Sequence, residues 1–429
     1  MRADAAAIGA LRASRLAFPI GVAVLLAGYA TLVGWDVFHY DWLRGYDAYA
    51  NSLYTDVIRL HHRLPTTSET GVWHTPPLFY VVAALIDSHR AVQVLDGVAS
   101  VVVVVFAGLI ARELFPRSRA IQLGAIAFAA LTPVLTRTAV MYHPEPLATA
   151  LAVVGLYVVV RGLARGRVTI WSGVLAGVLF GLATLTRTWA LAFAAASFLA
   201  LVGGRRLWAA LALGGVLLAF TLPWFVNQAR AHGSPFAFNR PAPKESFFSR
   251  RPPSFYTTLD VEAVFSRPYA PNYLNHLWPV VYTDWWGDYW RYFEIPYENI
   301  STPPELPGKY EDPRVRQSYV GIAPSLLAVA GFVGILAVGA RRRDPALLLV
   351  PASIVLLGLA FLVFQISYPH ADGDTIKATY LLDAVAPLAV CAAWALSSLR
   401  RAGRPVMIAV VLLLAYIATL DVDFLILPA

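Results

Sequence analysis

The sequence has 429 residues, of which 58% are hydrophobic and 14% charged, and apolar runs of this extent exceed what one or two water-soluble cores can bury. This composition excludes an ordinary soluble domain and predicts an all-α protein that crosses a membrane many times. The net charge of +8 comes from short basic clusters between apolar runs, a pattern of membrane topology that excludes a nucleic-acid-binding face. The 31 arginines against three lysines indicate a GC-rich genome and favour a bacterial plasma-membrane protein.

Hydropathy predicts about 11 membrane-spanning helices, within a range of about 10 to 13. The expected spans are 16–35, 91–111, 119–136, 145–160, 169–186, 188–203, 207–226, 319–339, 346–366, 379–398 and 405–420. We interpret the first span as an uncleaved anchor, because no convincing small-residue cleavage site accompanies it. A cytoplasmic N-terminus places the arginine clusters between later spans in cytoplasmic loops, as the positive-inside rule requires.

This topology divides the chain into an N-terminal transmembrane module at 1–226, an external cap loop at 227–318 and a C-terminal transmembrane module at 319–429. The first external loop, 36–90, contains the segment 74–88, which is apolar but too short to cross a membrane. We expect a re-entrant or surface-lying helix there. The cap loop is too rich in aromatic residues for a disordered linker and is expected to fold over the outer membrane face.

The first external loop contains an amphipathic stretch with the sequence GYDAYANSLYTDVIRL. Its apolar residues recur at helical spacing, as expected for a helix that lies on a membrane: Tyr46, Ala50, Leu53, Val57 and Leu60. Asp47, Asn51 and Tyr54 form the neighbouring stripe and present a carboxylate, an amide and a phenol at the depth of lipid headgroups. The alternative for this stripe is a solvated polar face.

A second acidic site lies in the sequence MYHPEPLATAL, where Glu145 is preceded by His143 at the outer end of a span. A carboxylate at that position is also favoured by the helix dipole alone. Three cations belong to the same face: Arg137, Arg187 and Lys377. Arg187 lies in a very short turn near the membrane, where an unpaired guanidinium costs about 2.5–3.5 kcal/mol. Binding a lipid phosphate would satisfy these cations, and snorkelling to the headgroups is the alternative.

Two further segments outside the spans carry candidate residues. Trp285 and Trp286, in the sequence TDWWGDYW, are suited either to an interfacial belt or to stacking on a sugar. Asp372 and Asp374, in HADGDTIK, have the spacing of oxygen ligands for a divalent cation, and the same sequence is typical of an ordinary turn. We therefore expect no required cofactor and leave a divalent cation open at these two aspartates.

Six motifs follow one another along the chain: GYDAYAN, HTPPLFYVVAAL, HPEPLATAL, GLATLTRTWAL, LPWFVNQARAHGSPFAF and KATYLLDAVAPLAV. In this order they resemble the bacterial relatives of dolichyl-phosphate-mannose protein mannosyltransferases and the aminoarabinose transferases of lipid A, which belong to the GT-C class of membrane glycosyltransferases. The resemblance implies that Asp47 is the catalytic base and that Glu145 assists near the sugar. Residues of these motifs, His74, His143 and Tyr380, are then expected to line the substrate together with Asn51, Tyr54, Trp285 and Trp286.

The chain departs from these relatives at two places. They commonly have a double acid where this sequence reads Asp47-Ala48, and a basic-Tyr-Leu-Pro motif where it reads Lys377-Ala378-Thr379-Tyr380. One base can still suffice, because the leaving phosphate monoester has a second pKa of about 6 and needs no proton at neutral pH. Cations would stabilise its charge while Asp47 takes the proton of the attacking hydroxyl, with inversion at the anomeric carbon.

The sequence thus predicts a membrane glycosyltransferase that moves a sugar from a polyprenyl-phosphate donor to a lipid, glycan or protein acceptor at the outer face. An oligosaccharide transferase that uses a lipid-pyrophosphate-linked glycan is the first alternative. A lipid or solute transporter is the second, and it requires charges buried within spans. The spans are almost free of acids, with Asp96 and Asp383 as the main exceptions.

Overall fold

The computed structural model describes residues 2–239, 251–273, 275–293, 313–368 and 375–427. Every regular element in these ranges is a helix. This is the expected outcome for a chain that crosses a membrane, because a helix satisfies its own backbone hydrogen bonds where no water is available.

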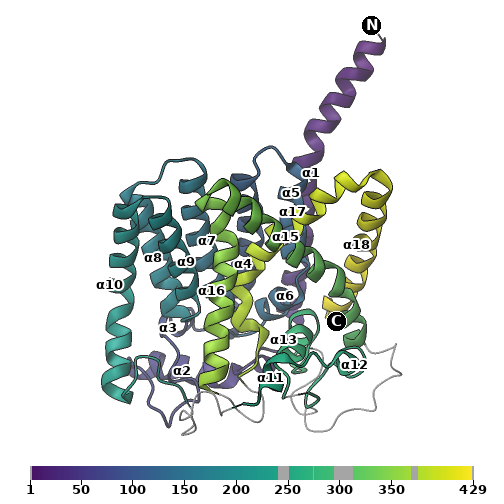
Figure 1. The fold of residues 1–429 in the computed structure, drawn as a ribbon. Helices are drawn as coiled ribbons and strands as arrows, with labels where there is room; N and C mark the ends of the chain where they lie inside the picture. Colours follow the sequence, from purple (N-terminus) through teal and green to yellow (C-terminus); the bar gives the residue numbers. More distant parts are fainter. Residues whose placement is uncertain (1, 240–250, 274, 294–312, 369–374, 428–429) are drawn as a thin grey trace.

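Long helices make up the body of the molecule and run between its two ends (Figure 1). They are α1 Arg2–His39, α4 His89–Leu114, α7 Glu145–Ala164, α8 Ile170–Thr186, α9 Ala190–Gly203, α10 Leu207–His232, α15 Ile322–Arg342, α16 Pro345–Ser367, α17 Val385–Ser398 and α18 Arg404–Leu425, together with the bent pair α5 Arg119–Ala130 and α6 Pro133–Ala139. The remaining elements are η1 Trp42–Arg44, α2 Ala48–His61, α3 Leu78–Ile86, α11 Pro253–Thr257, α12 Val261–Val264, α13 Leu277–Trp286, α14 Pro313–Val320, η3 Ala378–Ala384 and η4 Leu399–Ala402.

The helix lengths establish a multi-pass membrane protein. Within the described ranges, eight helical segments are long and apolar enough to span a bilayer, and a bent pair raises the number to nine. Helices α8 and α9 are also apolar but have only 17 and 14 residues. Each predicted span coincides with one of these helices or pairs, so the count of about 11 depends on whether α8 and α9 cross.

One predicted span differs in shape from the expectation. The stretch expected as a single helix at 119–136 consists of α5 and α6, which are bent by 54° to each other. Pro133 begins α6, and a proline disfavours the helical conformation of the residue before it and lacks a backbone N–H. The bend brings the short helix α6 under the cap segment, where it contacts α13.

The segment 36–90, predicted as the first external loop, contains the two short helices α2 and α3. Helix α3 has nine residues, too few to cross a bilayer, and it packs against α2, α4 and α8. Figure 1 shows α2 and α3 at the same end of the bundle as α11, α12 and α13 of the cap loop. The arginine-rich turns lie at the opposite end, where α1 begins. The short helices of the two long loops and the arginine clusters therefore occupy opposite ends of the molecule.

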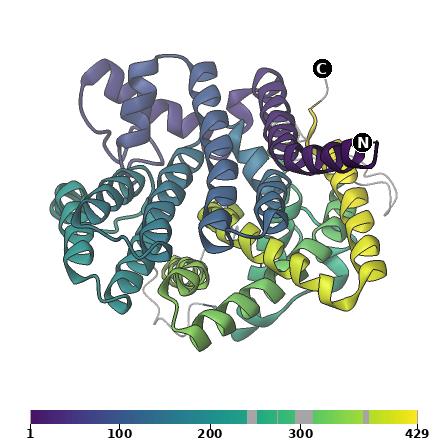
Figure 2. The ribbon, with the colours of Figure 1, turned by 90° about the horizontal axis from the view of Figure 1, so that it is seen from above.

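Figure 2 shows the helices of the bundle from above. Glycines allow some of these helices to approach closely. A Cβ atom at Gly173 of α8 would lie 2.2 Å from the carbonyl oxygen of Ala209 in α10, and one at Gly177 would lie 2.7 Å from that of Leu213. Lipid provides no hydrophobic driving force between helices, so such backbone contact is a main source of their cohesion. The α8–α10 seam is therefore intolerant of larger side chains.

Candidate active site

Asp47 lies at the start of α2 in a left-handed conformation, with φ of 51°. Aspartate tolerates this region better than most residues, and at a helix start its side chain ordinarily accepts a backbone N–H. Here the carboxylate caps no N–H of α2 and instead accepts from Lys377 Nζ at 3.0 Å. The Asp47 side chain is 34% exposed and that of Lys377 only 4%. The pair thus joins the first loop to the segment before η3 and leaves the carboxylate accessible.

The electrostatics of Asp47 follow from this pairing. Burial alone would raise the pKa of the carboxyl, but the ammonium of Lys377 outweighs it, with help from His143 and Arg187, and lowers the pKa to about 2. Asp47 is therefore ionised at neutral pH. The same cation that keeps the carboxylate charged also weakens it as a base.

A second carboxylate meets a second cation nearby. Glu145 opens α7, and its Oε1 lies 2.8 Å from Nε of Arg187, which follows the end of α8. Its other oxygen lies 2.5 Å from Nδ1 of His143. The ring of His143 also packs edge-on against Tyr46, the residue before Asp47, at 5.9 Å between centroids. Four predicted site residues from three separate turns, together with Lys377, therefore gather in one place.

A cavity of about 450 Å³ opens beside Arg187, and we call it the α9/α16 cavity. Its wall is mostly apolar and comes from the ends of α9, α10 and α16, with residues such as Leu191, Trp224 and Phe364, and from the segment 234–238 that follows α10. Arg187 and His74 supply its polar end, where Tyr380 stacks on Trp189 at 5.1 Å between ring centroids. The cavity combines a long apolar surface with a cationic end, which suits an amphiphile with an anionic headgroup.

His74 is a buried, neutral histidine on the wall of the α9/α16 cavity. Burial lowers its pKa to about 3, and the charge of Arg187 contributes, so the imidazole is neutral at physiological pH. Its Nδ1 is buried and, among the described residues, has no hydrogen-bond partner. A buried polar atom of this kind is costly unless something pairs with it. Its position on the cavity wall indicates a polar ligand at this end.

Arg137 occupies a different environment from the one predicted. The side chain is 1% exposed, and Nη1 donates to Asp288 Oδ1 at 3.1 Å while Nη2 donates to the carbonyl of Asp284. Both aspartates belong to the cap segment and are themselves fully buried. Arg137, unlike Arg187, does not line the α9/α16 cavity, and its charge is matched by the carboxylates of the cap segment, so we propose that it fastens the cap to α6 and does not bind phosphate.

Replacement of Arg137 by methionine is expected to destabilise the protein by about 3–5 kcal/mol, because it leaves buried carboxylates without their cation. A thermal unfolding curve of the purified protein in detergent measures this. Arg59→Met provides the matched control, since Arg59 pairs only with the exposed Asp56 and Asp87 and such surface pairs contribute about 0–1 kcal/mol. Equal stability of the two variants would refute the fastening role.

Asn51 and Tyr54 do not line the α9/α16 cavity themselves but are packed behind its wall, next to Thr75 and Tyr80. Asn51 donates to the carbonyl of Tyr142 at 3.2 Å and accepts from the hydroxyl of Tyr80 at 2.9 Å. Tyr54 stacks on Tyr80 at 3.9 Å and donates to the carbonyl of Thr75. Protein groups thus satisfy both residues, and we assign them to positioning α2 and not to contact with substrate.

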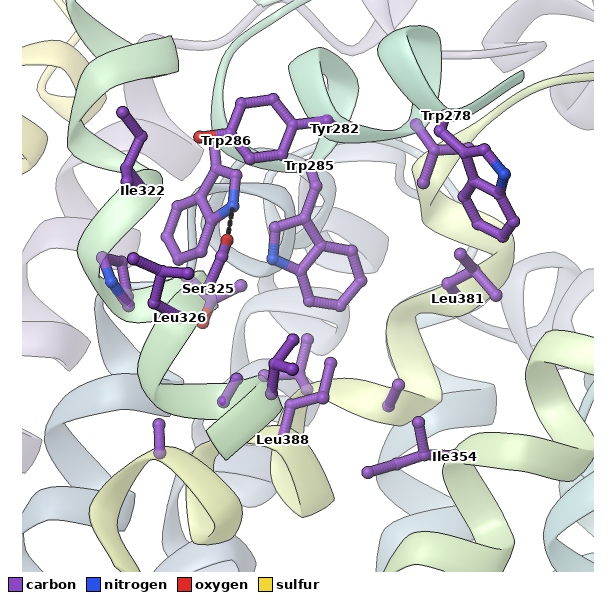
Figure 3. A pocket seen from close by; sticks show the side chains of 18 of the residues that line it. Trp278, Tyr282, Trp285, Trp286, Ile322, Ser325, Leu326, Ile354, Leu381 and Leu388 are labelled. Carbon is purple, nitrogen blue, oxygen red and sulfur yellow. Dashed lines mark hydrogen bonds between the residues drawn. The ribbon is translucent and has the colours of Figure 1, made fainter. Parts of the chain in front are cut away.

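Trp285 and Trp286 line a second cavity, of about 660 Å³, which we call the α13/α15 cavity (Figure 3). It lies between α13, α15, η3 and α17 and shares no lining residue with the α9/α16 cavity. The indole N–H of Trp286 donates to Ser325 Oγ at 2.9 Å. The two tryptophans therefore do not face the carboxylates where sugar stacking was predicted.

The predicted metal ligands Asp372 and Asp374 lie outside the described residues. Among the residues that are described, no group of three or more histidine, cysteine, aspartate or glutamate side chains is placed to hold a metal ion. The possibility of a divalent cation at these aspartates stays a prediction.

Sequence reasoning missed the residues that hold the carboxylate pairs in place. Asp284 accepts from the Tyr46 hydroxyl at 2.6 Å and from the backbone N–H of Ala378 at 2.7 Å, so it links the residues next to Asp47 and Lys377. A signal was present in TDWWGDYW, where two aspartates at i and i+4 interrupt an aromatic run. Charged residues within such an apolar segment indicate buried partners.

Comparisons with known proteins show what this chain is similar to. Residues 74–226 match the protein family described as dolichyl-phosphate-mannose-protein mannosyltransferase. A search of the curated proteins found no significant match. The archaeal oligosaccharyltransferase AglB from Archaeoglobus fulgidus, solved with an inhibitory peptide and a dolichol-phosphate, has a TM-score of 0.54 and 14% identity over 93% of this chain and 55% of AglB. Its apo form gives a TM-score of 0.51 and 14% identity over 94% and 55%.

ArnT from Cupriavidus metallidurans, solved with undecaprenyl phosphate, gives a TM-score of 0.48 and 16% identity over 95% of this chain and 74% of ArnT. The likeness to AglB shows that this chain has the GT-C-like fold that its motifs predicted. The chain spans about half the length of AglB.

Proposed function

We propose that the chain is an integral-membrane glycosyltransferase that transfers a sugar from a polyprenyl-phosphate donor to a hydroxyl or amine acceptor, with inversion. The observation that carries this proposal is the meeting of two carboxylate–cation pairs, Asp47 with Lys377 and Glu145 with Arg187, beside an apolar cavity with a cationic end. The family match over 74–226 and the fold support it. We further propose that this end of the molecule faces the outside of a bacterial plasma membrane.

The donor fits the α9/α16 cavity by its chemistry. The prenyl chain would lie along the apolar wall formed by α9, α10 and α16, within the hydrocarbon layer. Its phosphate would reach Arg187, whose planar guanidinium suits bidentate contact with phosphate oxygens, and the unpartnered Nδ1 of His74 would contact a polar headgroup atom. The anomeric carbon then lies between the phosphate and the two carboxylates.

The reaction divides between cations and a base. The acceptor oxygen attacks the anomeric carbon while the bond from that carbon to the phosphate oxygen breaks, and the electron pair leaves with the phosphate. Arg187 and Lys377 stabilise the departing charge, and Asp47 takes the acceptor proton. Glu145, held by His143 and Arg187, lies where it contacts the sugar. No acid is needed on the leaving group, since a phosphate monoester departs as an anion.

The pairing of Asp47 with Lys377 makes the base depend on the donor. A carboxylate with a pKa of about 2 accepts a proton weakly. When the donor phosphate draws the ammonium of Lys377 toward itself, burial becomes the dominant influence and the pKa of Asp47 rises. The base therefore gains strength when its substrate is bound.

Replacement of Lys377 by methionine is expected to shift the acid limb of the pH profile of kcat/KM to higher pH. Removing the cation leaves burial to raise the pKa of Asp47, so the base is protonated, and activity lost, at a pH where the native enzyme is still active. Lys377→Arg keeps the charge and is expected to keep the native limb. A methionine variant whose residual activity has the native acid limb would contradict the coupling.

An oligosaccharide transferase that uses a lipid-pyrophosphate-linked glycan is the second candidate, because AglB, which shares the fold, is described as an oligosaccharyltransferase. The transporter alternative requires charges buried within spans, and the main candidates are Asp96 and Asp383. Asp96 Oδ2 accepts from the backbone N–H of His143 at 3.4 Å, and Asp383 Oδ1 accepts from the hydroxyl of Thr149 at 2.6 Å. These contacts support a structural role for both acids beside the site and make a transporter the less favoured hypothesis.

The proposed function is tested by incubating the purified protein with a panel of radiolabelled polyprenyl-phosphate sugars and bacterial membrane extract. We expect one donor to give a labelled product and unlabelled polyprenyl phosphate. Label transferred only from a pyrophosphate-linked oligosaccharide would select the second candidate. Absence of covalent product, with label accumulating inside sealed vesicles, would establish a transporter.

A further inference from the structure

The α13/α15 cavity is not used by the reaction proposed above, and its wall is almost entirely apolar. The spanning helices α15, α16 and α17 contribute Leu326, Ile354 and Leu388 to one end of it (Figure 3). The cap helix α13 contributes aromatic side chains to the other: Trp278, Tyr282, Trp285 and Trp286. Indole and phenol rings favour the boundary between hydrocarbon and headgroups, so the cavity reproduces the polarity gradient of a bilayer leaflet.

Nearly all polar atoms on this wall already have protein partners. Trp278 Nε1 donates to the carbonyl of Tyr256, the hydroxyl of Tyr282 donates to the carbonyl of Ser318, and Trp286 pairs with Ser325. For the indole N–H of Trp285, no partner is found in the described part of the chain. The cavity thus offers a long apolar surface with one hydrogen-bond donor at its aromatic end.

The cavity is open toward the lipid. Leu326 and Val329 of α15 belong to its wall and are 65% and 62% exposed, and both lie on a helix that spans the membrane. A hydrocarbon chain can enter sideways from the bilayer without crossing a polar surface. A water-soluble peptide or sugar has no comparable reason to occupy this apolar space.

The cavity also lies directly behind the active site. Asp284 precedes Trp285, and its carboxylate contacts the Tyr46 hydroxyl and the Ala378 N–H, next to Asp47 and Lys377. The two cavities use opposite sides of η3, since Leu381 lines one and Tyr380 the other. A lipid whose chain fills this cavity would have its headgroup at the aromatic end formed by α13, with Asp284 between the cavity and the pair of Asp47 and Lys377.

The geometry points to the α13/α15 cavity as the binding site for an acyl chain of the acceptor, which is therefore a membrane lipid. An ester or amide carbonyl of that lipid would accept a hydrogen bond from the Trp285 indole N–H. The hydrocarbon chain of a polyprenyl phosphate has no carbonyl and could not make this contact. That the bound lipid is the acceptor rests on the proposed glycosyltransferase function. Occupation of the cavity by a lipid does not depend on turnover.

Gly358 of α16 provides a precise way to fill the cavity. The residue lines the cavity, and a Cβ atom added there meets no atom within 4 Å. Leucine at this position occupies the space and also raises helix propensity, so the fold is not weakened. Gly215→Leu is the matched control, because Gly215 lies on the spanning helix α10, is also free of neighbours within 4 Å and lines neither cavity.

The experiment places the full-length protein in vesicles of phosphatidylethanolamine and phosphatidylglycerol that contain a phosphatidylethanolamine with a diazirine on one acyl chain. After illumination, we expect labelled peptides from α15, α16 and α17. Gly358→Leu is expected to reduce this labelling about tenfold, as an overpacking cost of about 1.4 kcal/mol implies. Gly215→Leu and Arg187→Ala are expected to label as the native protein does, and added undecaprenyl phosphate is expected not to compete.

Native labelling in Gly358→Leu, or displacement of the probe by undecaprenyl phosphate, would overturn the lipid site. The acceptor assignment requires in addition that Gly358→Leu raise KM for transfer to the lipid fraction about tenfold while binding of undecaprenyl phosphate stays unchanged. Reduced labelling with unchanged transfer would overturn that assignment. If the native protein transferred no sugar, the proposed function would fail while the labelling result still decided the lipid site.

Discussion

Replacement of Asp47 by asparagine is expected to lower the rate of sugar transfer by about 100- to 10,000-fold, the range over which a positioned general base contributes. Asparagine has the shape of aspartate and can still accept from Lys377, so the start of α2 is expected to stay in place. The initial rate at saturating donor measures the loss. Size-exclusion chromatography and a thermal unfolding curve establish that the variant is folded.

Asp56→Asn is the control for Asp47→Asn. Asp56 belongs to the same helix α2, but its side chain is 44% exposed and pairs with Arg59 at the surface. This variant tests whether loss of any carboxylate on this loop lowers the transfer rate. We expect the native rate for Asp56→Asn. An Asp47→Asn variant that transfers sugar at the native rate would remove Asp47 from the mechanism.

Replacement of Arg187 by methionine is expected to weaken binding of undecaprenyl phosphate by about 10- to 100-fold, because a charge-assisted hydrogen bond contributes about 1.5–3 kcal/mol. The effect on transfer is expected to be larger, about 100- to 1,000-fold, since the same cation stabilises the departing phosphate in the transition state. Equilibrium binding of radiolabelled undecaprenyl phosphate separates the first effect from the second.

The contact with Glu145 requires a second variant for Arg187. Methionine at this position leaves a buried carboxylate without its strongest partner, and binding could fall for that reason alone. In the pair Arg187→Met with Glu145→Gln the uncompensated charge is gone. We expect this pair still to bind the phosphate weakly. Native affinity in the pair would mean that Arg187 only neutralises Glu145.

The parts of the site that the sequence predicted are those where topology decides position. Once the arginine clusters fix which ends of the spans lie together, Glu145, Arg187 and Lys377 must share one end with the first loop. The structure places them there with Asp47. Their chemical types then limit the pairings, because carboxylates near a membrane require cations.

Other parts depended on long-range packing that periodicity does not encode. The two stripes of α2 were identified, but Asn51 and Tyr54 of the polar stripe are buried in the protein interior, while Leu60 of the apolar stripe is exposed. A helix at a membrane surface can turn its apolar side to lipid and its polar side to protein. The contact of Arg137 with Asp288 could not be predicted, because Asp288 lies 151 residues later in the chain.

The glycine seam between α8 and α10 also bears on how a long-chain donor reaches its site. Helices joined through backbone contact at Gly173 and Gly177 cannot part without losing that contact along their length, so this side of the bundle is sealed. Over their described lengths, α10 and α16 make no extended contact with each other, although both contribute to the wall of the α9/α16 cavity. We therefore expect the prenyl chain of a donor to enter the cavity from the bilayer between α10 and α16. The polyprenyl phosphate left after transfer would leave by the same route.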